Sequence, residues 1–494
     1  MSWGADVLGV TEETFSMIKS TTAGINTGTG LQGVDLQPLV SLVPVDTPFR
    51  NSNPRVPAPM GATNAYWETL LNVNSGQSNA AVQNDYAGPI ANIDLQNVYA
   101  PFAVLAQGGT VTQDAIAQAQ GYADALAVGT LQTLNQLLIS DDINQLNAIS
   151  FPLPAIATPA TTASTTGGTI AGGTAVYVKV APISGNNYYY GGSGPASAAS
   201  ALVTTSTTTS TGSVTATVAA VKCAAGYNWY VGTTSTNGTY YTTTAVNTVT
   251  ITSGPFTTAQ APPTTLPLFT SATPSPTPPT ADTSYESYWQ TGLLGSILGD
   301  LGTSNYATPG TATSQGAYYK SVDGGTFTVS GAAVEELDNL NLALYSAYQL
   351  SPTRYLMPMG VITNLANAVL NNPQAVTWLV PTDADGRARV VAGGHVATYL
   401  NKTVGGKPIA LELHPHLPPG KVIAVVDEVP FPGANIDTVL SVETQLDYWR
   451  FDYGASRVAN VSGGGPRYDF EIRSKQAFRN KAGSVMGVLD NLNY

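Results

Sequence analysis

The histidines are the first candidates for chemistry in this sequence. His414 and His416 flank Pro415, and His395 is the third histidine. Imidazole nitrogens bind metals such as zinc, but a metal site needs further ligands that converge on them. We therefore expect the pair to form a structural turn before a strand, and we predict no metal-ligating residue.

Paired carboxylates are the second candidates. Glu335 is followed by Glu336, Asp141 by Asp142, and Asp427 by Glu428. Adjacent residues on a helix point about 100° apart, so they do not face each other as an acid and a base. We expect no catalytic residue among them.

Glycine runs could mark phosphate loops. Residues 463–465 are three glycines, and Gly405 precedes Gly406. Neither run has the Lys-Ser/Thr continuation or the strand-to-helix context of a phosphate loop. No nucleophile-elbow motif occurs either. We expect turns at these glycines, no catalytic or cofactor-binding residue, no cofactor and no enzyme activity.

Charge is sparse and unevenly distributed. Only 10% of the 494 residues are charged and the net charge is −12, whereas a typical protein has about a quarter of its residues charged. This balance argues against a nucleic-acid reader, which carries a basic patch. It does not exclude a wall that encloses nucleic acid. No Lys or Arg lies between Arg55 and Lys179, whereas basic residues recur from Arg450 to Lys481.

The cysteine content and the length of the apolar runs indicate the compartment in which the chain folds. Cys223 is the single cysteine, so no disulfide forms within the chain. Residues 1–10 lack the basic and apolar regions of a signal peptide. No apolar run reaches the ~18 residues of a membrane span. We expect folding in a reducing cytoplasm and no membrane association.

The N-terminal third predicts three segments that position no active site. Residues 1–52 resemble an arm, with a short helix at Thr11–Ser20 and many prolines after it. Residues 53–108 predict a long hairpin, with strands around 66–71 and 90–105 and a polar tip at 72–84. Residues 109–154 hold a long helix over about 111–140, for which Thr110 and Gln113 have capping-box spacing.

Residues 155–281 form a compositional island. They contain no Asp or Glu, and Thr and Ser dominate. Alternating segments such as Val176–Val180 and Tyr227–Val231 predict an inserted all-β sandwich. We expect its core to be independent of the rest of the chain, so that a short Gly/Ser linker in place of 156–281 leaves a foldable subunit.

The remaining segments return to mixed character. Residues 282–440 predict helices at Val334–Tyr348 and Val361–Leu370 and a strand at Val422–Val426. Residues 441–494 predict strands, including Tyr468–Ile472. The fold class is therefore α+β with an inserted sandwich.

This order of parts resembles the Hong Kong 97-type major capsid proteins of tailed bacteriophages. The residues that carry the resemblance are Val334–Asp338 with Tyr355–Met359, Leu413–Val426, and Gln445–Ile472. The resemblance implies an N-terminal arm (1–52), an extended hairpin loop (53–108), a spine helix and peripheral lobe (109–154), an axial lobe with connecting elements (282–440), and a peripheral-lobe return (441–494). The island (155–281) resembles an immunoglobulin-like or fibronectin type III-like module.

The resemblance also implies a function. We expect a structural protein that self-assembles into the icosahedral head enclosing double-stranded DNA, located in the virion capsid and assembled in the host cytoplasm. The expected partners are copies of this chain in pentamers and hexamers, portal, scaffold and decoration proteins, DNA contacted nonspecifically, and glycans bound weakly by the inserted domain. An encapsulin-type nanocompartment shell and a carbohydrate-binding or adhesion protein remain as alternatives.

Two details depend on the resemblance. Some shells of this family crosslink a hairpin lysine to a neighbouring subunit, but the hairpin here contains no lysine. We therefore expect noncovalent assembly between subunits. The basic residues from Arg450 to Lys481 face either packaged DNA or acidic residues across subunit contacts, and the acidic surface favours the second.

Overall fold

The computed structural model describes residues 45–72, 94–119, 124–204, 212–236, 238–254, 275, 277–280, 282, 290–298, 317–330, 333–370, 396–402, 405–429, 438–456 and 467–493. Most of the predicted arm, the hairpin tip, His395 and the 463–465 glycines lie outside these residues. The chain divides into two compact units. Within the described residues, unit 1 contains Val104–Asp141 and Thr444–Gln476, and unit 2 contains Pro48–Ala103, Asp142–Glu443 and Ala477–Tyr494.

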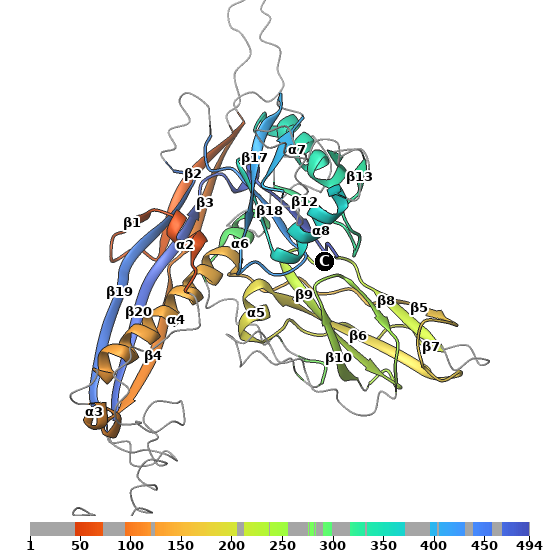
Figure 1. Cartoon of the computed structure of the whole chain (residues 1–494), viewed down its shortest axis with the longest axis horizontal. Coiled ribbons are helices and arrows are strands. Elements are labelled where there is room, and N and C mark those ends of the chain that lie inside the picture. Colours follow the sequence, from red (N-terminus) through yellow and green to blue (C-terminus); the bar gives the residue numbers. More distant parts are fainter. Residues whose placement is uncertain are drawn as a thin grey trace, which may run out of the picture. The chain divides into compact units, whose positions relative to one another are not determined.

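Unit 1 packs a long helix on long strands. Helices α3 (Gln113–Ala119) and α4 (Ala125–Asn147) accompany strands β4 (Ala103–Thr112), β19 (Leu440–Ser456) and β20 (Arg467–Asn480) (Figure 1). Leu137 of α4 packs with Phe470 and Ile472 of β20 and with Leu105 of β4. The strands of unit 1 are neighbours in the order β19-β20-β4. Strand β1 (Arg55–Pro57) belongs to unit 2.

The helix expected over 111–140 begins later and is divided. Strand β4 continues to Thr112, whose hydroxyl accepts a hydrogen bond from Ala115 N at 3.3 Å at the start of α3. Helix α4 has its own cap, because Asp124 Oδ1 accepts from Leu126 N at 2.9 Å and from Ala127 N at 3.1 Å. The Thr110–Gln113 capping box is therefore wrong, since Thr110 still belongs to the strand.

The hairpin in unit 2 consists of β2 (Asn64–Asn72) and β3 (Asp94–Pro101), and the short helix α2 (Pro48–Ser52) precedes it. Tyr66 pairs with Tyr99 and Trp67 with Val98 in the antiparallel register. The strand expected over 90–105 ends at Pro101, because β4 joins a different sheet. One face of the hairpin buries Ala65, Trp67, Val98 and Ala100 against Ala477.

A mixed six-stranded sheet forms the centre of unit 2. Its order is β12-β21-β18-β15-β17-β16, with bounds β12 Tyr318–Ser321, β15 Arg354–Met357, β16 Thr398–Asn401, β17 Lys407–Leu413, β18 Val422–Val425 and β21 Gly487–Asp490. All four residues of β18 are buried, as expected for a central strand covered on both faces.

Helices α7 (Glu335–Tyr348) and α8 (Met359–Leu370) pack on this sheet, and the positions predicted for both are confirmed. Leu337, Leu340 and Leu344 of α7 share a buried cluster with Tyr355 and Leu411 of the sheet. The smaller elements are α6 (Leu293–Leu298), β13 (Val329–Ser330), β14 (Ala333–Val334) and the 3-10 helix η3 (Gly483–Val485).

The island folds as two facing sheets. One has the order β10-β9-β6-β7 and the other β11-β8-β5. Their bounds are β5 Ala160–Ser164, β6 Ala175–Ser184, β7 Val203–Thr204, β8 Ser213–Thr217, β9 Ala224–Gly232, β10 Thr239–Thr244 and β11 Thr248–Ile251. Val178 and Trp229 from the first sheet and Ala216 and Ile251 from the second share one buried cluster. The island also contains a short helix, α5 (Gly185–Tyr190).

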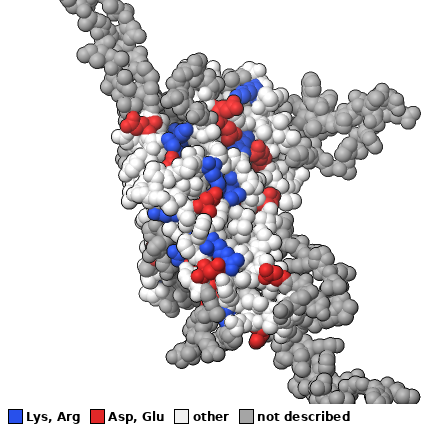
Figure 2. Space-filling model, turned by 90° about the vertical axis from the view of Figure 1, so that its left-hand side faces the viewer, with Lys and Arg blue, Asp and Glu red and all other residues white. Residues whose placement is uncertain are grey.

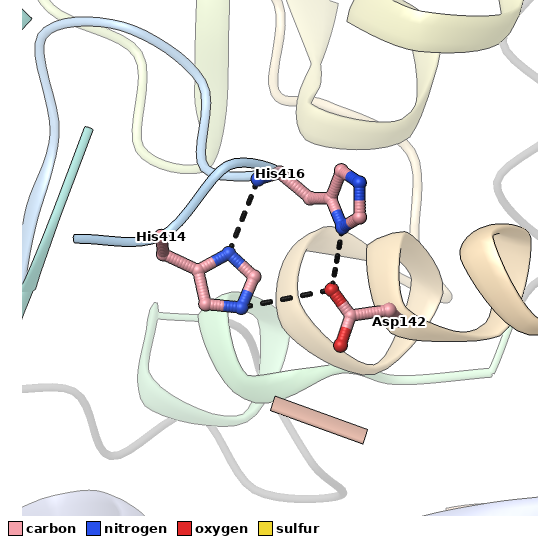
Figure 3. A group of neighbouring side chains, drawn as sticks. All are labelled: Asp142, His414 and His416. Carbon is pink, nitrogen blue, oxygen red and sulfur yellow. Dashed lines mark hydrogen bonds and ion pairs between the residues drawn. The ribbon is translucent and has the colours of Figure 1, made fainter. Parts of the chain in front are cut away.

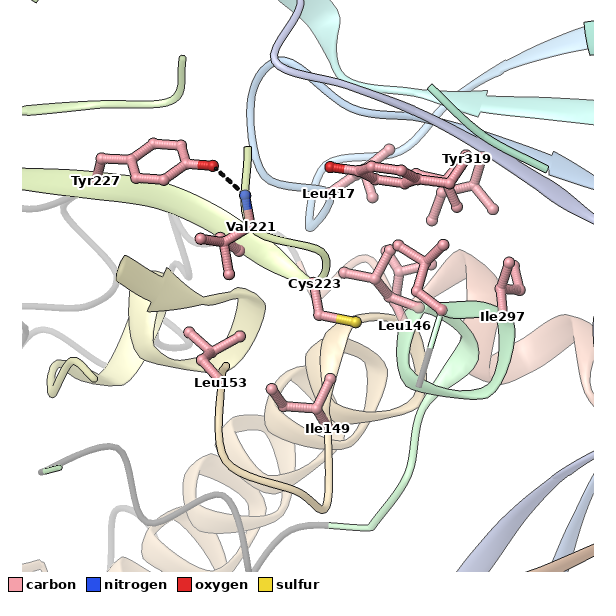
Figure 4. Packing of buried hydrophobic residues seen from close by; sticks show 14 of the residues in the cluster. Leu146, Ile149, Leu153, Val221, Cys223, Tyr227, Ile297, Tyr319 and Leu417 are labelled. Carbon is pink, nitrogen blue, oxygen red and sulfur yellow. Dashed lines mark hydrogen bonds between the residues drawn. The ribbon is translucent and has the colours of Figure 1, made fainter. Parts of the chain in front are cut away.

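The sandwich core is not independent. Its buried cluster continues into Leu146 and Ile149 at the end of α4, Ile297 of α6 and Tyr319 of β12 (Figure 4). Cys223 lies at this junction, and burial raises the pKa of its thiol to about 12. The expectation of two independent cores is therefore wrong, because the end of the spine helix is shared between the sandwich and the central sheet.

The α+β class predicted from the sequence is confirmed. Within the described part of the chain, no helix combines the length and apolarity needed to cross a membrane.

Candidate functional sites: a buried histidine–aspartate cluster and exposed aromatic faces

Asp142 and the two histidines of the 414–416 turn form a buried cluster in unit 2. Helix α4 carries Asp142, and the turn between β17 and β18 carries His414 and His416. Asp142 Oδ2 lies 2.6 Å from His416 Nδ1 and 3.6 Å from His414 Nε2 (Figure 3). The backbone N–H of Arg50 in α2 donates to Asp142 Oδ1 at 2.8 Å.

Hydrogen bonding indicates the tautomer of His414. Its Nδ1 accepts a hydrogen bond from the backbone N–H of His416 at 3.2 Å. The accepting nitrogen of a neutral imidazole carries no proton, so the proton lies on Nε2, which faces Asp142. Asp142 is thus a buried carboxylate surrounded by N–H groups, which offset the cost of its burial.

The three side chains are of the metal-binding kind, and their ligand atoms lie within 4.8 Å of one another. Zinc at 2.0–2.1 Å from each ligand would separate two tetrahedral ligands by roughly 3.3 Å, whereas Asp142 Oδ2 and His416 Nδ1 are 2.6 Å apart. Metal on His414 Nε2 would also place a proton on Nδ1, against the N–H of His416. The observed arrangement is instead a hydrogen-bonded contact between α4 and the 414–416 turn.

The sequence prediction located the histidines correctly in a turn before a strand, but it did not predict that Asp142 contacts them. Asp142 and His416 are 274 residues apart in the sequence, so no short-range spacing of residues indicates that they are in contact. That none of these residues is catalytic or metal-ligating stays a prediction.

The other predicted carboxylates have structural partners. Asp141 accepts hydrogen bonds from Tyr448 and Gln476 within unit 1. Glu336 accepts from the backbone N–H of Thr328 at 3.0 Å. Asp427 forms an ion pair with Arg354 at 3.0 Å. Asp141 and Asp142 therefore have different partners, as the helical geometry predicted for adjacent residues.

The last turns of α4 connect further segments of unit 2 through buried amides. Asn186 of α5 donates to Asn144 at 2.7 Å, Asn53 donates to Gln145 at 3.2 Å, and Asn147 donates to the His416 carbonyl at 2.7 Å. These hydrogen bonds therefore hold α2, α5 and the histidine turn against the end of α4.

The outer face of the hairpin is aromatic and exposed. The side chains alternate along β2 and β3, so the residues between the buried ones point outward. Tyr66 is 66% exposed and Tyr99 is 41% exposed. Their ring centroids are 6.1 Å apart, which makes them one aromatic pair.

A second exposed aromatic row lies on β19 in unit 1. Trp449, Phe451 and Tyr453 occur at every second position, and Trp449 and Tyr453 are each 59% exposed. Arg473 stacks over Phe451, with 5.8 Å from its guanidinium carbon to the ring centroid. Contiguous exposed apolar side chains on a soluble protein mark interaction surfaces.

The basic residues of the C-terminal strands have acidic partners within the chain. Arg450 pairs with Asp452 at 2.7 Å, Arg467 with Asp469 at 3.1 Å, Arg473 with Glu471 at 2.9 Å and Arg479 with Glu443 at 2.7 Å. In Figure 2, positive and negative side chains alternate on one face, and most of that face carries no charge.

Comparison with known proteins gives many similar solved structures, of which three are described. "Capsid of native GTA particle computed with C5 symmetry" is 10% identical, with 94% of this chain and 97% of that chain covered and a TM-score of 0.41. "The capsid of Myoviridae Phage XM1" is 9% identical over 94% and 97%, with a TM-score of 0.38. "Mycobacterium phage Bobi" is 10% identical over 90% of each chain, with a TM-score of 0.36. No family model and no curated protein matches the sequence.

Proposed function

We propose that this chain is a structural subunit that assembles with copies of itself into a closed icosahedral shell, the major capsid protein of a tailed bacteriophage head. The observation that carries the proposal is the exposed aromatic face of the β2–β3 hairpin. A two-stranded hairpin is marginally stable in water by itself. A face that shows Tyr66 and Tyr99 to solvent is incomplete until a second chain covers it.

The order of elements supports the same proposal. A hairpin, a long helix, a mixed central sheet and two long returning strands follow one another along the chain, in the order that the sequence resemblance implied. The aromatic row on β19 adds a second surface for protein contacts. Asp141, Asp142, Glu336 and Asp427 are each engaged in a hydrogen bond or ion pair within the chain, which supports a structural role for these acids.

The finer parts of the proposal follow from this role. Pentamers and hexamers of the chain enclose double-stranded DNA, with portal, scaffold and decoration proteins as partners and the virion as the location. The sandwich is displayed on the outside, where its Thr- and Ser-rich surface binds glycans weakly. An encapsulin-type shell differs in its cargo, so nucleic-acid content distinguishes the two.

A double substitution tests the assembly surface. Tyr66→Ser with Tyr99→Ser removes the exposed aromatic pair without touching the buried face of the hairpin. We expect the thermal unfolding temperature of the subunit to stay within a few degrees, because surface substitutions rarely change stability by more than about 0.5 kcal/mol. Sedimentation velocity should show at least a tenfold loss of assembled particles.

The matched control is Tyr345→Ser, an exposed aromatic residue on α7, which should assemble as the natural chain does. Normal assembly of the double variant would contradict the proposal that the hairpin face is an intersubunit contact.

A further inference from the structure

A lysine and an aspartate meet inside unit 2 without contact to solvent. Lys421 Nζ lies 2.6 Å from Asp490 Oδ1, and their side chains are 0% and 2% exposed. Lys421 directly precedes β18, and Asp490 ends β21. The register pairs Val422 with Leu489 in antiparallel strands, so Lys421 and Asp490 lie opposite each other.

The surroundings of this pair are apolar and aromatic. The adjacent cross-strand residues, Val422 with Leu489 and Ile423 with Val488, belong to the two buried clusters on the two faces of the sheet. An apolar environment disfavours separated charges. Lys421 and Asp490 are therefore in direct contact rather than apart.

Two groups hold the aspartate in place. The backbone N–H of Asn491 donates to Asp490 Oδ1 at 2.9 Å, and the hydroxyl of Tyr319 donates to Oδ2 at 3.3 Å. Asn491 has a φ of 56°, in the left-handed region. Burial, together with the Asp490 carboxylate, raises the pKa of Tyr319 well above its ordinary value, so the phenol keeps its proton and remains a donor.

We propose that Lys421 and Asp490 join in an amide bond within one chain. With a C–O bond of about 1.23 Å, the 2.6 Å contact places Nζ within about 3.8 Å of the carboxyl carbon, Cγ. In this step the Lys421 ammonium gives one proton to Oδ2, and the nitrogen lone pair that this frees attacks Cγ, while the N–H of Asn491 stabilises the negative charge that develops on Oδ1. The nitrogen then gives a second proton to Oδ2, the C–Oδ2 bond breaks, and Oδ2 leaves as water. One ammonium and one carboxylate thus become one amide and one water.

The bond has a structural consequence. Residues 421 and 490 are 69 positions apart, and β19 and β20 lie wholly between them in the sequence. The amide therefore closes a covalent ring that contains both long strands. Tension on those strands cannot separate β21 from β18 in the centre of the sheet while the ring is closed.

Intact-mass spectrometry of the full-length folded chain tests the proposal without any variant. We expect a mass below that of the sequence by about 18 Da, one water. Trypsin should no longer cleave after Lys421, and tandem spectra should show its peptide joined to the C-terminal peptide that contains Asp490. A mass equal to that of the sequence, with normal cleavage after Lys421, would overturn the proposal. It would show that Lys421 and Asp490 form only an ion pair.

Lys421→Arg is the matched control, because a guanidinium keeps the positive charge next to Asp490 but is not a nucleophile at neutral pH. Asp490→Ala removes the carboxyl group. Both variants should have the full mass of their sequence, with no loss of water. A loss of about 18 Da that persists in Lys421→Arg would assign the dehydration to another position, such as an aspartate before glycine, and would also overturn the proposal.

Discussion

At the residue scale, Asp142 connects segments that are far apart in the sequence. It binds the backbone of α2 and the two histidines of the 414–416 turn. The sequence predicted a turn at the histidines because of Pro415, which was correct. It could not predict Asp142 as their partner, since only the packing of α4 beside that turn brings residues 142 and 416 together.

Asp142→Ala should strongly destabilise unit 2. The substitution leaves the N–H of Arg50 and the Nδ1 of His416 buried without their acceptor, and breaking a buried pair of this kind costs about 3–5 kcal/mol. Urea denaturation followed by tryptophan fluorescence measures the free energy of unfolding. Asp114→Ala, in the exposed first turn of α3, should change it by less than about 1 kcal/mol. Equal losses in the two variants would show that the cluster contributes nothing particular to stability.

At the element scale, regular patterns were predictable and irregular ones were not. Leu337, Leu340 and Leu344 follow the helical period, and α7 lies where they predict. Strand β5 has the sequence ATTAS, which shows no alternation of polar and apolar residues, and it was missed. The start of α3 was misplaced because Thr112, rather than Thr110, caps it. The paired sheets of the island were predictable, but the merging of their core with α4 was not, because it depends on packing.

The sandwich provides the prediction at this scale. Trp229 is fully buried, and its Nε1 donates to Thr244 Oγ1 at 2.7 Å. Trp229→Ala should cost about 3–5 kcal/mol. Because the core is shared, calorimetry should show unit 2 unfolding in one destabilised transition rather than a separate loss of the sandwich.

Replacing residues 156–281 with a Gly/Ser linker extends that test. The replacement exposes Leu146, Ile149 and Ile297, which are now buried with the sandwich. We expect insoluble or strongly destabilised protein, contrary to the expectation from sequence alone. A soluble deletion variant with an unchanged unfolding temperature would show that the shared core is dispensable.

At the scale of the whole molecule, the chain has sparse charge, and its described residues include two exposed aromatic faces. Both features suit a protein that completes its packing with neighbours. Arg450, Arg467, Arg473 and Arg479 of β19 and β20 each pair with an acid of the same chain. Among the described residues, the exposed aromatic faces are therefore the surfaces that we propose for assembly.

Mature particles should contain no covalent links between subunits. No lysine lies between Arg55 and Lys179, so the hairpin has no amine for an intersubunit amide. Denaturing gels of boiled, reduced particles should show one band at the monomer mass. The amide proposed between Lys421 and Asp490 lies within one chain and leaves this band in place. A ladder of oligomers would contradict noncovalent assembly.

Electron microscopy of the purified chain, alone and with its scaffold protein supplied, tests the central claim most directly. The account predicts closed icosahedral shells built from pentamers and hexamers, with contacts of the obligate kind that bury more than about 2,000 Å². A chain that remains monomeric under every assembly condition, with its partners present, would contradict it.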